Sequence, residues 1–153
     1  MSNHSWEYDE DTDKSIESIM DLVRYYSDKY EVDGITVSGG EPFDQTELND
    51  LLSCLKNDGY DDILVYTGYY LEELSEYKEA LENISVLIDG PYVEELNDDL
   101  PLRGSSNQHI YIFDSKLADK YSEYLQMPRS FDVDFDNGIM TVIGLLPSEK
   151  ENT

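Results

Sequence analysis

Cysteine is almost absent from this chain. The sequence of 153 residues holds a single cysteine, Cys54, which excludes a disulfide bond within the chain. No apolar stretch approaches the ~20 residues that a helix needs to cross a bilayer. The first residues also lack the basic and then apolar pattern of a secretion signal. Together these absences predict no membrane association and a reducing, cytoplasmic location.

Positive charge is scarce as well. The sequence has 10 lysines and arginines against 35 acidic residues, a formal net charge of -25. Binding to a nucleic-acid backbone depends on cations, so we expect no direct nucleic-acid partner. The plainest interpretation of the acids is a solvated surface that keeps the protein soluble. Docking to a basic partner surface and mimicry of nucleic acid are the alternatives, and no acidic block is long enough to favour mimicry.

What remains is typical of one globular domain. Hydrophobic residues make up 39% of the sequence, and 13 tyrosines add large side chains with a polar tip. The length suits a sizeable core but is short of an eight-unit barrel. We therefore expect a single domain over residues 1–146, followed by a disordered tail at 147–153.

Hydrophobic periodicity places the secondary structure. Apolar residues recur at helical spacing, which predicts helices at 13–30, 44–58, 71–81 and 117–125. Short β-branched or continuous apolar runs predict strands, at 35–37, 63–66, 84–88 and 109–113. Residues 92–108 show no periodicity and are predicted as a long loop. Asp44 and Glu47 have the spacing of a capping box at the start of the second helix, and Asp58-Gly59 has the pattern of its end.

The tail changes period from helical to alternating. Phe131, Val133 and Phe135 alternate with aspartates, Asn137-Gly138 is a hairpin turn signal, and apolar residues return at 139–145. These features predict an antiparallel hairpin appended to the main sheet. The fold class expected for the chain is α/β, with a mostly parallel sheet resembling a partial (β/α) barrel and this hairpin at the C-terminal end.

Alternating strands and helices imply right-handed crossovers, which bring the carboxyl ends of parallel strands to one edge of the sheet. Three strands of the predicted sheet end in glycine, with Gly39-Gly40-Glu41, Thr67-Gly68 and Asp89-Gly90. Ligands bind at such an edge in open and barrel α/β proteins. Taken alone, the glycine pair at 39–40 suits a tight turn between strand and helix as well as it suits a binding site.

Four motifs in order carry a resemblance to a known family. Ser38-Gly39-Gly40-Glu41-Pro42 resembles the GGEP motif of radical S-adenosylmethionine enzymes. It is followed by Val65-Tyr66-Thr67-Gly68, the segment 86–92 with Asp89-Gly90-Pro91, and the segment 102–108 with Arg103-Gly104-Ser105. In this order the motifs look like those of the activating proteins of anaerobic ribonucleoside-triphosphate reductase, over roughly residues 3 to 113.

The resemblance implies a function and a set of binding residues. The family cleaves S-adenosylmethionine reductively at a 4Fe-4S cluster and forms a glycyl radical on the large subunit of its partner reductase. By resemblance, Glu41 and the backbone of Gly39 and Gly40 would receive the methionine ammonium, with a charge-assisted hydrogen bond from ammonium to carboxylate. Thr67 and Asp89 would contact the rest of the cofactor. Arg103 would belong to a cofactor or docking loop, or would pair with neighbouring acids.

The same family holds its cluster on three cysteines spaced C-x3-C-x2-C, shortly before an Asn and a Trp. Asn3 and Trp6 match the residues that follow, but the only thiol is Cys54, on a predicted helix, where packing is the simpler role. His4 and His109 show no metal-ligand spacing with it. We therefore assign no catalytic or metal-binding residue and expect a truncated or degenerate activating protein. The alternative is a non-catalytic acidic binding module on the same scaffold.

Overall fold

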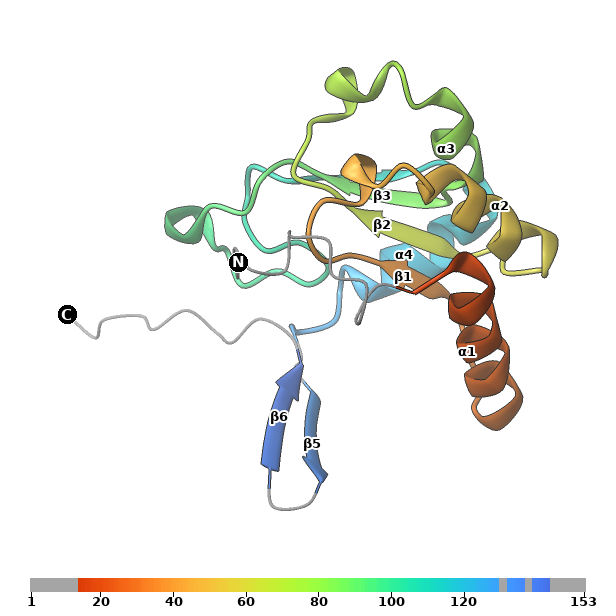
Figure 1. The fold of residues 1–153 in the computed structure, drawn as a ribbon. Helices are drawn as coiled ribbons and strands as arrows, with labels where there is room; N and C mark the ends of the chain where they lie inside the picture. Colours follow the sequence, from red (N-terminus) through yellow and green to blue (C-terminus); the bar gives the residue numbers. More distant parts are fainter. Residues whose placement is uncertain (1–13, 130–131, 137–138, 144–153) are drawn as a thin grey trace.

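The computed structural model describes residues 14–129, 132–136 and 139–143, in two sheets and the helices around them (Figure 1). The expected tail at 147–153, the Asn137-Gly138 turn, and the family-like Asn3 and Trp6 lie outside the described residues. The α-helices are α1 (Ile16–Lys29), α2 (Leu48–Asn57), α3 (Lys78–Asn83) and α4 (Ala118–Tyr124). The strands are β1 (Ile35–Val37), β2 (Ile63–Tyr66), β3 (Val86–Asp89), β4 (His109–Ile112), β5 (Asp132–Asp136) and β6 (Ile139–Ile143).

The main sheet has the strand order β1-β2-β3-β4. Strands β1, β2 and β3 are parallel, with Val37 opposite Val65 and Tyr66 opposite Ile88. Strand β4 runs antiparallel to β3. The α/β class and the mostly parallel sheet predicted from the sequence are therefore confirmed. Strands β5 and β6 pair antiparallel as predicted, and this hairpin is a two-stranded sheet of its own, separate from the main sheet.

Helix boundaries follow tertiary contacts more than local signals. Asp44 does not cap α2: it lies in the short 3-10 helix η2 (Pro42–Asp44), where the Tyr69 hydroxyl donates to its Oδ1 at 2.8 Å. Helix α2 instead begins at Leu48 without a side-chain cap, so the predicted capping box is wrong. Its end is as predicted, because Gly59 follows with a φ of 96°.

The predicted helix at 71–81 is split, and smaller 3-10 turns flank the regular elements. The split consists of η3 (Leu71–Leu74) and α3. The predicted loop at 92–108 contains η4 (Glu94–Leu96), and η5 (Ser115–Leu117) precedes α4. Within the residues that the structure describes, none of the helices has the length and apolar character that a membrane crossing requires.

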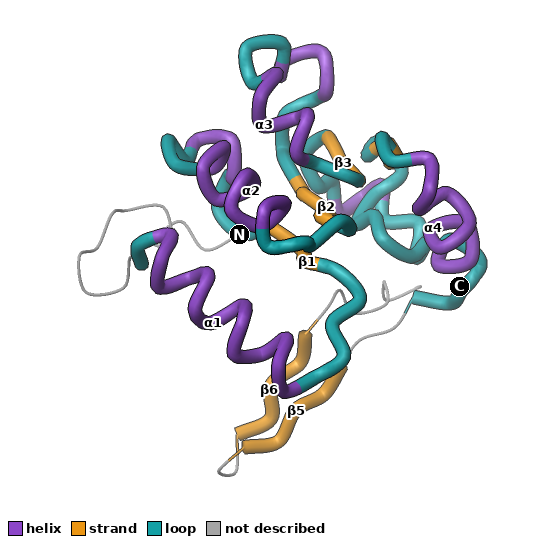
Figure 2. The backbone as a smooth tube through the Cα atoms, turned by 90° about the vertical axis from the view of Figure 1, so that its right-hand side faces the viewer, coloured by secondary structure: helices purple, strands orange, loops and turns teal. Residues whose placement is uncertain are grey.

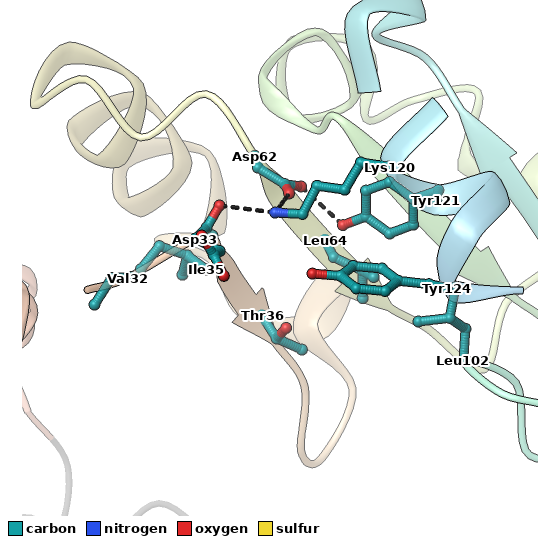
Figure 3. A pocket seen from close by; sticks show the side chains of 11 residues that line it. Val32, Asp33, Ile35, Thr36, Asp62, Leu64, Leu102, Lys120, Tyr121 and Tyr124 are labelled. Carbon is teal, nitrogen blue, oxygen red and sulfur yellow. Dashed lines mark hydrogen bonds and ion pairs between the residues drawn. The ribbon is translucent and has the colours of Figure 1, made fainter. Parts of the chain in front are cut away.

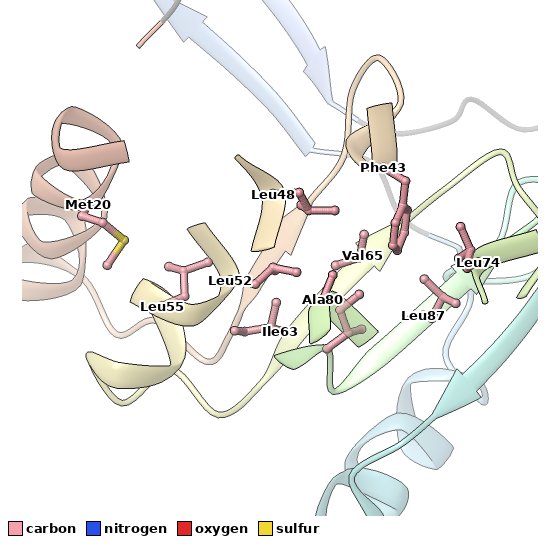
Figure 4. Close-up of a cluster of buried hydrophobic side chains, with 11 residues drawn as sticks. Met20, Phe43, Leu48, Leu52, Leu55, Ile63, Val65, Leu74, Ala80 and Leu87 are labelled. Atoms are coloured by element: carbon pink, nitrogen blue, oxygen red, sulfur yellow. The ribbon is translucent and has the colours of Figure 1, made fainter. Parts of the chain in front are cut away.

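Side chains of the strands alternate between two faces of the sheet. On one face, Ile63, Val65 and Leu87 join residues from α1, α2 and α3 in the larger apolar cluster (Figure 4). Leu52 of α2 and Ile63 are fully buried there. Figure 2 shows α1 and α2 on this side of the sheet and α4 on the other. The core that holds the strand ends in place is therefore mainly on the face that α1, α2 and α3 cover.

The opposite face carries a smaller cluster around Leu64 and Tyr121. Here a cavity of about 300 Å³ lies between the start of β1 and α4 (Figure 3). Asp62 accepts hydrogen bonds from Lys120 Nζ at 2.8 Å and from the Tyr121 hydroxyl at 2.8 Å. Lys120 also donates to the Asp33 carbonyl at 3.0 Å. This polar network joins α4 to the amino ends of β1 and β2.

Candidate functional site

The turn after β1 exposes backbone at the carboxyl edge of the sheet. Gly39 and Gly40 have φ values of 92° and 54°, a region that residues with a Cβ rarely adopt. A Cβ built on Gly39 would meet no atom within 4 Å, so glycine is needed here for the backbone conformation and not to relieve crowding. The glycine pair thus makes the tight turn and also leaves its backbone open to a ligand.

Glu41 is the centre of the hydrogen bonds at this edge. Its Oε1 accepts from the Phe43 backbone N–H at 3.1 Å and from Thr67 Oγ1 at 2.7 Å. Its Oε2 accepts from the Gly68 backbone N–H at 2.7 Å. The carboxylate therefore ties the turn after β1 to the turn after β2. A carboxylate has about four acceptor positions, so capacity for a ligand donor remains.

Asp89 ends β3 and is fully buried. Its Oδ2 accepts from the Leu71 N–H at 2.9 Å, and its Oδ1 lies 3.0 Å from the His109 backbone N and 2.9 Å from His109 Nδ1. Burial, and then the charge of Asp89, raise the pKa of Tyr111. Within the described residues no hydrogen bond joins Asp89 to Glu41. Asp89 thus stabilises this edge through hydrogen bonds to β4 and to the start of η3.

His109 is the residue at this edge that the sequence alone did not single out. It is the antiparallel partner of Asp89 in the sheet, and its side chain is 58% exposed. The ring lies near the Tyr70 ring, with 6.3 Å between centroids. The pairing of β3 with β4 brings the histidine to the buried aspartate. Twenty residues separate the two in the sequence, and no local pattern marks that register.

The structure brings the predicted site residues together unequally. Glu41 and Thr67 are in direct contact, and the ends of β2 and β3 are joined by the Thr67 N–H to Ile88 carbonyl bond at 3.0 Å. The Gly90 N–H also donates to the Tyr69 carbonyl at 2.9 Å. Asp89 lies at the same edge, but its carboxylate is used within the protein.

Arg103 is held within its own loop. Its Nε lies 3.1 Å from Asp98 Oδ2, and its Nη1 donates to the Gln108 carbonyl at 3.4 Å. Burial of Asp98 would raise its pKa, but the hydrogen bond and charge of Arg103 and the backbone hydrogen bond from Leu100 together outweigh this, and the pKa is lowered. Of the two sequence interpretations of Arg103, the ion pair with a neighbouring acid is present. Its role in a cofactor or docking loop stays a prediction.

The described residues do not fit a 4Fe-4S cluster. Cys54 is a free, partly buried thiol on α2 that packs against the larger apolar cluster. Such a cluster needs several thiolates. In the described part of the chain, no group of three or more His, Cys, Asp or Glu side chains is arranged to hold a metal ion. Among the described residues, no such group lies at the edge around Glu41.

A comparison with known proteins shows the family to which this chain belongs. The family model of the 4Fe-4S single cluster domain matches residues 1–111, so the chain belongs to that family. More particularly, it is similar to the anaerobic ribonucleoside-triphosphate reductase-activating proteins. It is 38% identical to the one from Escherichia coli over 84 residues and 43% identical to the one from Haemophilus influenzae over 86 residues. The resemblance inferred from the motifs is thereby confirmed.

These matches cover part of each protein. The Escherichia coli match takes in 51% of this chain and 54% of the relative, so the chain spans about half the length of the curated relatives it matches. The reductase-activating protein of Enterobacteria phage T4 is 31% identical over 101 residues, or 63% of this chain and 64% of that relative. No solved structure matches the chain.

Proposed function

We propose that this chain is the S-adenosylmethionine-binding scaffold of an activating protein for anaerobic ribonucleotide reductase. The observation that carries the proposal is the hydrogen-bonding of Glu41 to Thr67 and Gly68 at the carboxyl edge of the sheet. It fixes the carboxylate beside a glycine turn with open backbone. The chain spans about half the length of these relatives, so the activity and the partner are proposed here as well.

Glu41 is the residue that would hold the cofactor's ammonium group. Three donors within the protein orient its carboxylate before any ligand arrives, so little ordering of the side chain is required on binding. The backbone of Gly39 and Gly40 lies next to it without side chains to block approach. In the chemistry that the resemblance implies, S-adenosylmethionine is the source of the radical. Glu41 and the glycine turn beside it would position this ligand.

The partner proposed is the large subunit of the anaerobic reductase. Its support is the similarity of this chain to activating proteins of that reductase. The net charge of -25 favours a basic docking surface on the partner and gives electrostatic steering at low salt.

The test is calorimetric titration of S-adenosylmethionine into the full chain. Glu41→Gln keeps the shape of the side chain and removes its charge. We expect it to bind with an affinity at least about tenfold lower, because a hydrogen bond to a charged group is lost. Thr67→Val removes one donor to the carboxylate and should weaken binding by a smaller factor. Glu17→Gln on exposed α1 changes the net charge equally and should bind as the unchanged protein does. Absent binding, or equal affinity of the Glu41→Gln variant, would contradict the proposal.

A second candidate is a non-catalytic acidic binding module on the same scaffold. It is favoured by the single cysteine of the sequence and by the lack, among the described residues, of a group suited to a metal ion. Titration with S-adenosylmethionine separates the two candidates, because the binding module would not bind it, and anaerobic reconstitution with iron and sulfide tests whether either holds a cluster. We expect no 4Fe-4S absorbance from this chain, with or without the Cys54→Ala change. A stoichiometric cluster would rule out the second candidate.

A further inference from the structure

A second cavity, of about 400 Å³, lies on the face that the larger apolar cluster occupies, between η2, the start of α2 and the start of α3. Neither Glu41 nor Asp89 lines it, so it is separate from the edge described above. Its apolar lining consists of buried residues that Figure 4 labels within the larger apolar cluster, namely Phe43, Leu48 and Ala80. Its volume is within the range of small-ligand sites.

Two aromatic rings form part of this wall. Phe43 and Tyr77 pack edge to face, with 5.1 Å between ring centroids and 78° between planes. Phe43 is 2% exposed whereas Tyr77, which also lines the cavity, is 39% exposed. The exposed face of an aromatic ring attracts cations.

The side-chain oxygen of Asn49 is an acceptor without a hydrogen-bond donor among the described residues. Its Nδ2 lies 3.4 Å from Glu79 Oε2, and this donor contact sets which end of the amide is the oxygen. Its Oδ1 is buried and has no hydrogen-bond partner among the described residues. Buried acceptors are nearly always satisfied, because leaving one unpaired is destabilising. Asn49 lines the cavity, so a ligand donor would satisfy this oxygen once the side chain turned it toward the cavity.

Asp44 adds a negative charge to the same lining. One of its oxygens accepts from the Tyr69 hydroxyl, and that hydrogen bond together with the charge of Asp44 raises the pKa of Tyr69. The amino end of α2 contributes a partial positive charge of about one half. Asp44, Glu47 and Asp50 lie around that end, and the lining includes no lysine or arginine. The local field therefore favours a cation.

We propose that this cavity receives an arginine side chain of a partner protein. The guanidinium is a planar cation with five donors, suited to one carboxylate and one amide oxygen together, and it stacks on aromatic rings. Its aliphatic stem would cover the apolar wall. A lysine ammonium is a compact, strongly hydrated charge and matches this lining less well. The inference does not depend on the proposed cofactor site, because the cavity shares no lining residue with Glu41 and Thr67.

The first experiment is a titration of the full chain with N-acetyl-arginine amide, followed by NMR of the backbone amides. We expect saturable shifts centred on residues 43–49 and 77–80, with a dissociation constant in the millimolar range that is usual for a fragment of this size. The affinity for the neutral isostere N-acetyl-citrulline amide should be at least about tenfold lower. N-acetyl-lysine amide should fall between the two.

Two variants and a matched control sharpen the result. Asn49→Ala removes the unpaired acceptor and Asp44→Asn removes the charge, and each should weaken arginine binding by about tenfold. Asp119→Asn makes the same change in net charge at an exposed position of α4, outside the lining, and should bind as the unchanged protein does. Thermal unfolding of each variant verifies that it is folded. Equal binding of citrulline, shifts spread over the whole acidic surface, or unaltered affinity in both variants would overturn the proposal.

Discussion

The two faces of the main sheet are stabilised in different ways. The face covered by α1, α2 and α3 is an apolar cluster with fully buried leucines such as Leu52. The other face has fewer buried apolar residues and relies on Asp62, which joins Lys120 and Tyr121 of α4 (Figure 3). Apolar burial does not titrate, whereas a hydrogen-bonded ionic network does. One sheet is therefore insensitive to pH on one face and sensitive to it on the other.

Both faces are made by the same strands. Residues 63 and 65 of β2 point to the larger cluster, while Leu64 points to the smaller one. A strand buried on both faces is a continuous apolar run, and β2 has that composition. The difference between the faces therefore comes from what packs on them, and not from the strands.

The largest effect is expected from the apolar face. Leu52→Ala should reduce the free energy of unfolding by about 2–5 kcal/mol, because it removes a fully buried side chain and leaves a cavity. Urea denaturation measures this loss. Leu22→Ala changes a leucine of α1 that is 45% exposed and should stay within about 0.5 kcal/mol. A loss in Leu52→Ala no larger than that of the control would contradict the packing described here.

A smaller effect is expected from the polar face. Asp62→Ala removes the acceptor of both Lys120 and Tyr121, and we expect a loss of about 1–3 kcal/mol in the free energy of unfolding. Asp119→Ala, at an exposed position of α4, is the control and should have little effect. Equal stability of the two variants in urea would show that the network contributes nothing.

The smallest effect concerns alkaline pH. Burial, and then the hydrogen bond to Asp62, raise the pKa of Tyr121. Burial would lower the pKa of Lys120, but the hydrogen bond and charge of Asp62 outweigh it, so that pKa is raised too. Both groups then keep their proton in the folded state above the unfolded-state values of about 10 and 10.4. Their contribution to the free energy of unfolding is complete below ~pH 10 and is lost as the pH rises further.

Urea unfolding between about pH 8 and 11 measures this loss. Tyr121→Phe should reduce the alkaline decline in stability. The reduction should be partial, because burial also raises the pKa of Tyr66, which contributes to the same decline. Leu52→Ala should lower stability at every pH and leave the slope unchanged. A Tyr121→Phe variant with the same slope as the unchanged protein would remove the pH contrast between the faces.

Much of the fold was predictable because its signals are local. The predicted strands at 35–37 and 63–66 coincide with β1 and β2, and Gly59 ends α2 where its pattern indicated. Continuous apolar runs require burial on both faces, and only a few arrangements provide that. The parallel order of β1, β2 and β3 followed from the alternation of strands with helices.

The errors occurred where a side chain had two competing partners. Asp44 has the spacing of a helix cap, but the hydroxyl of Tyr69 binds it instead. Local spacing indicates which cap is available and gives no information on a donor 25 residues away. The same limit applies to the edge described here, where the sequence pointed to Glu41 and Thr67 but not to the pairing of Asp89 with His109.

The sequence by itself determined the alternation of strands and helices, the glycine turn before Glu41, the resemblance to the reductase-activating proteins and the presence of a single cysteine, because each is a property of residue type and order. Only the tertiary structure decided that Glu41 accepts a hydrogen bond from Thr67, that Asp89 is used internally, and that the buried Oδ1 of Asn49 has no hydrogen-bond partner among the described residues. The physical reason is that hydrogen bonds depend on distance and direction between atoms. Chain order constrains these only after the sheet register is set.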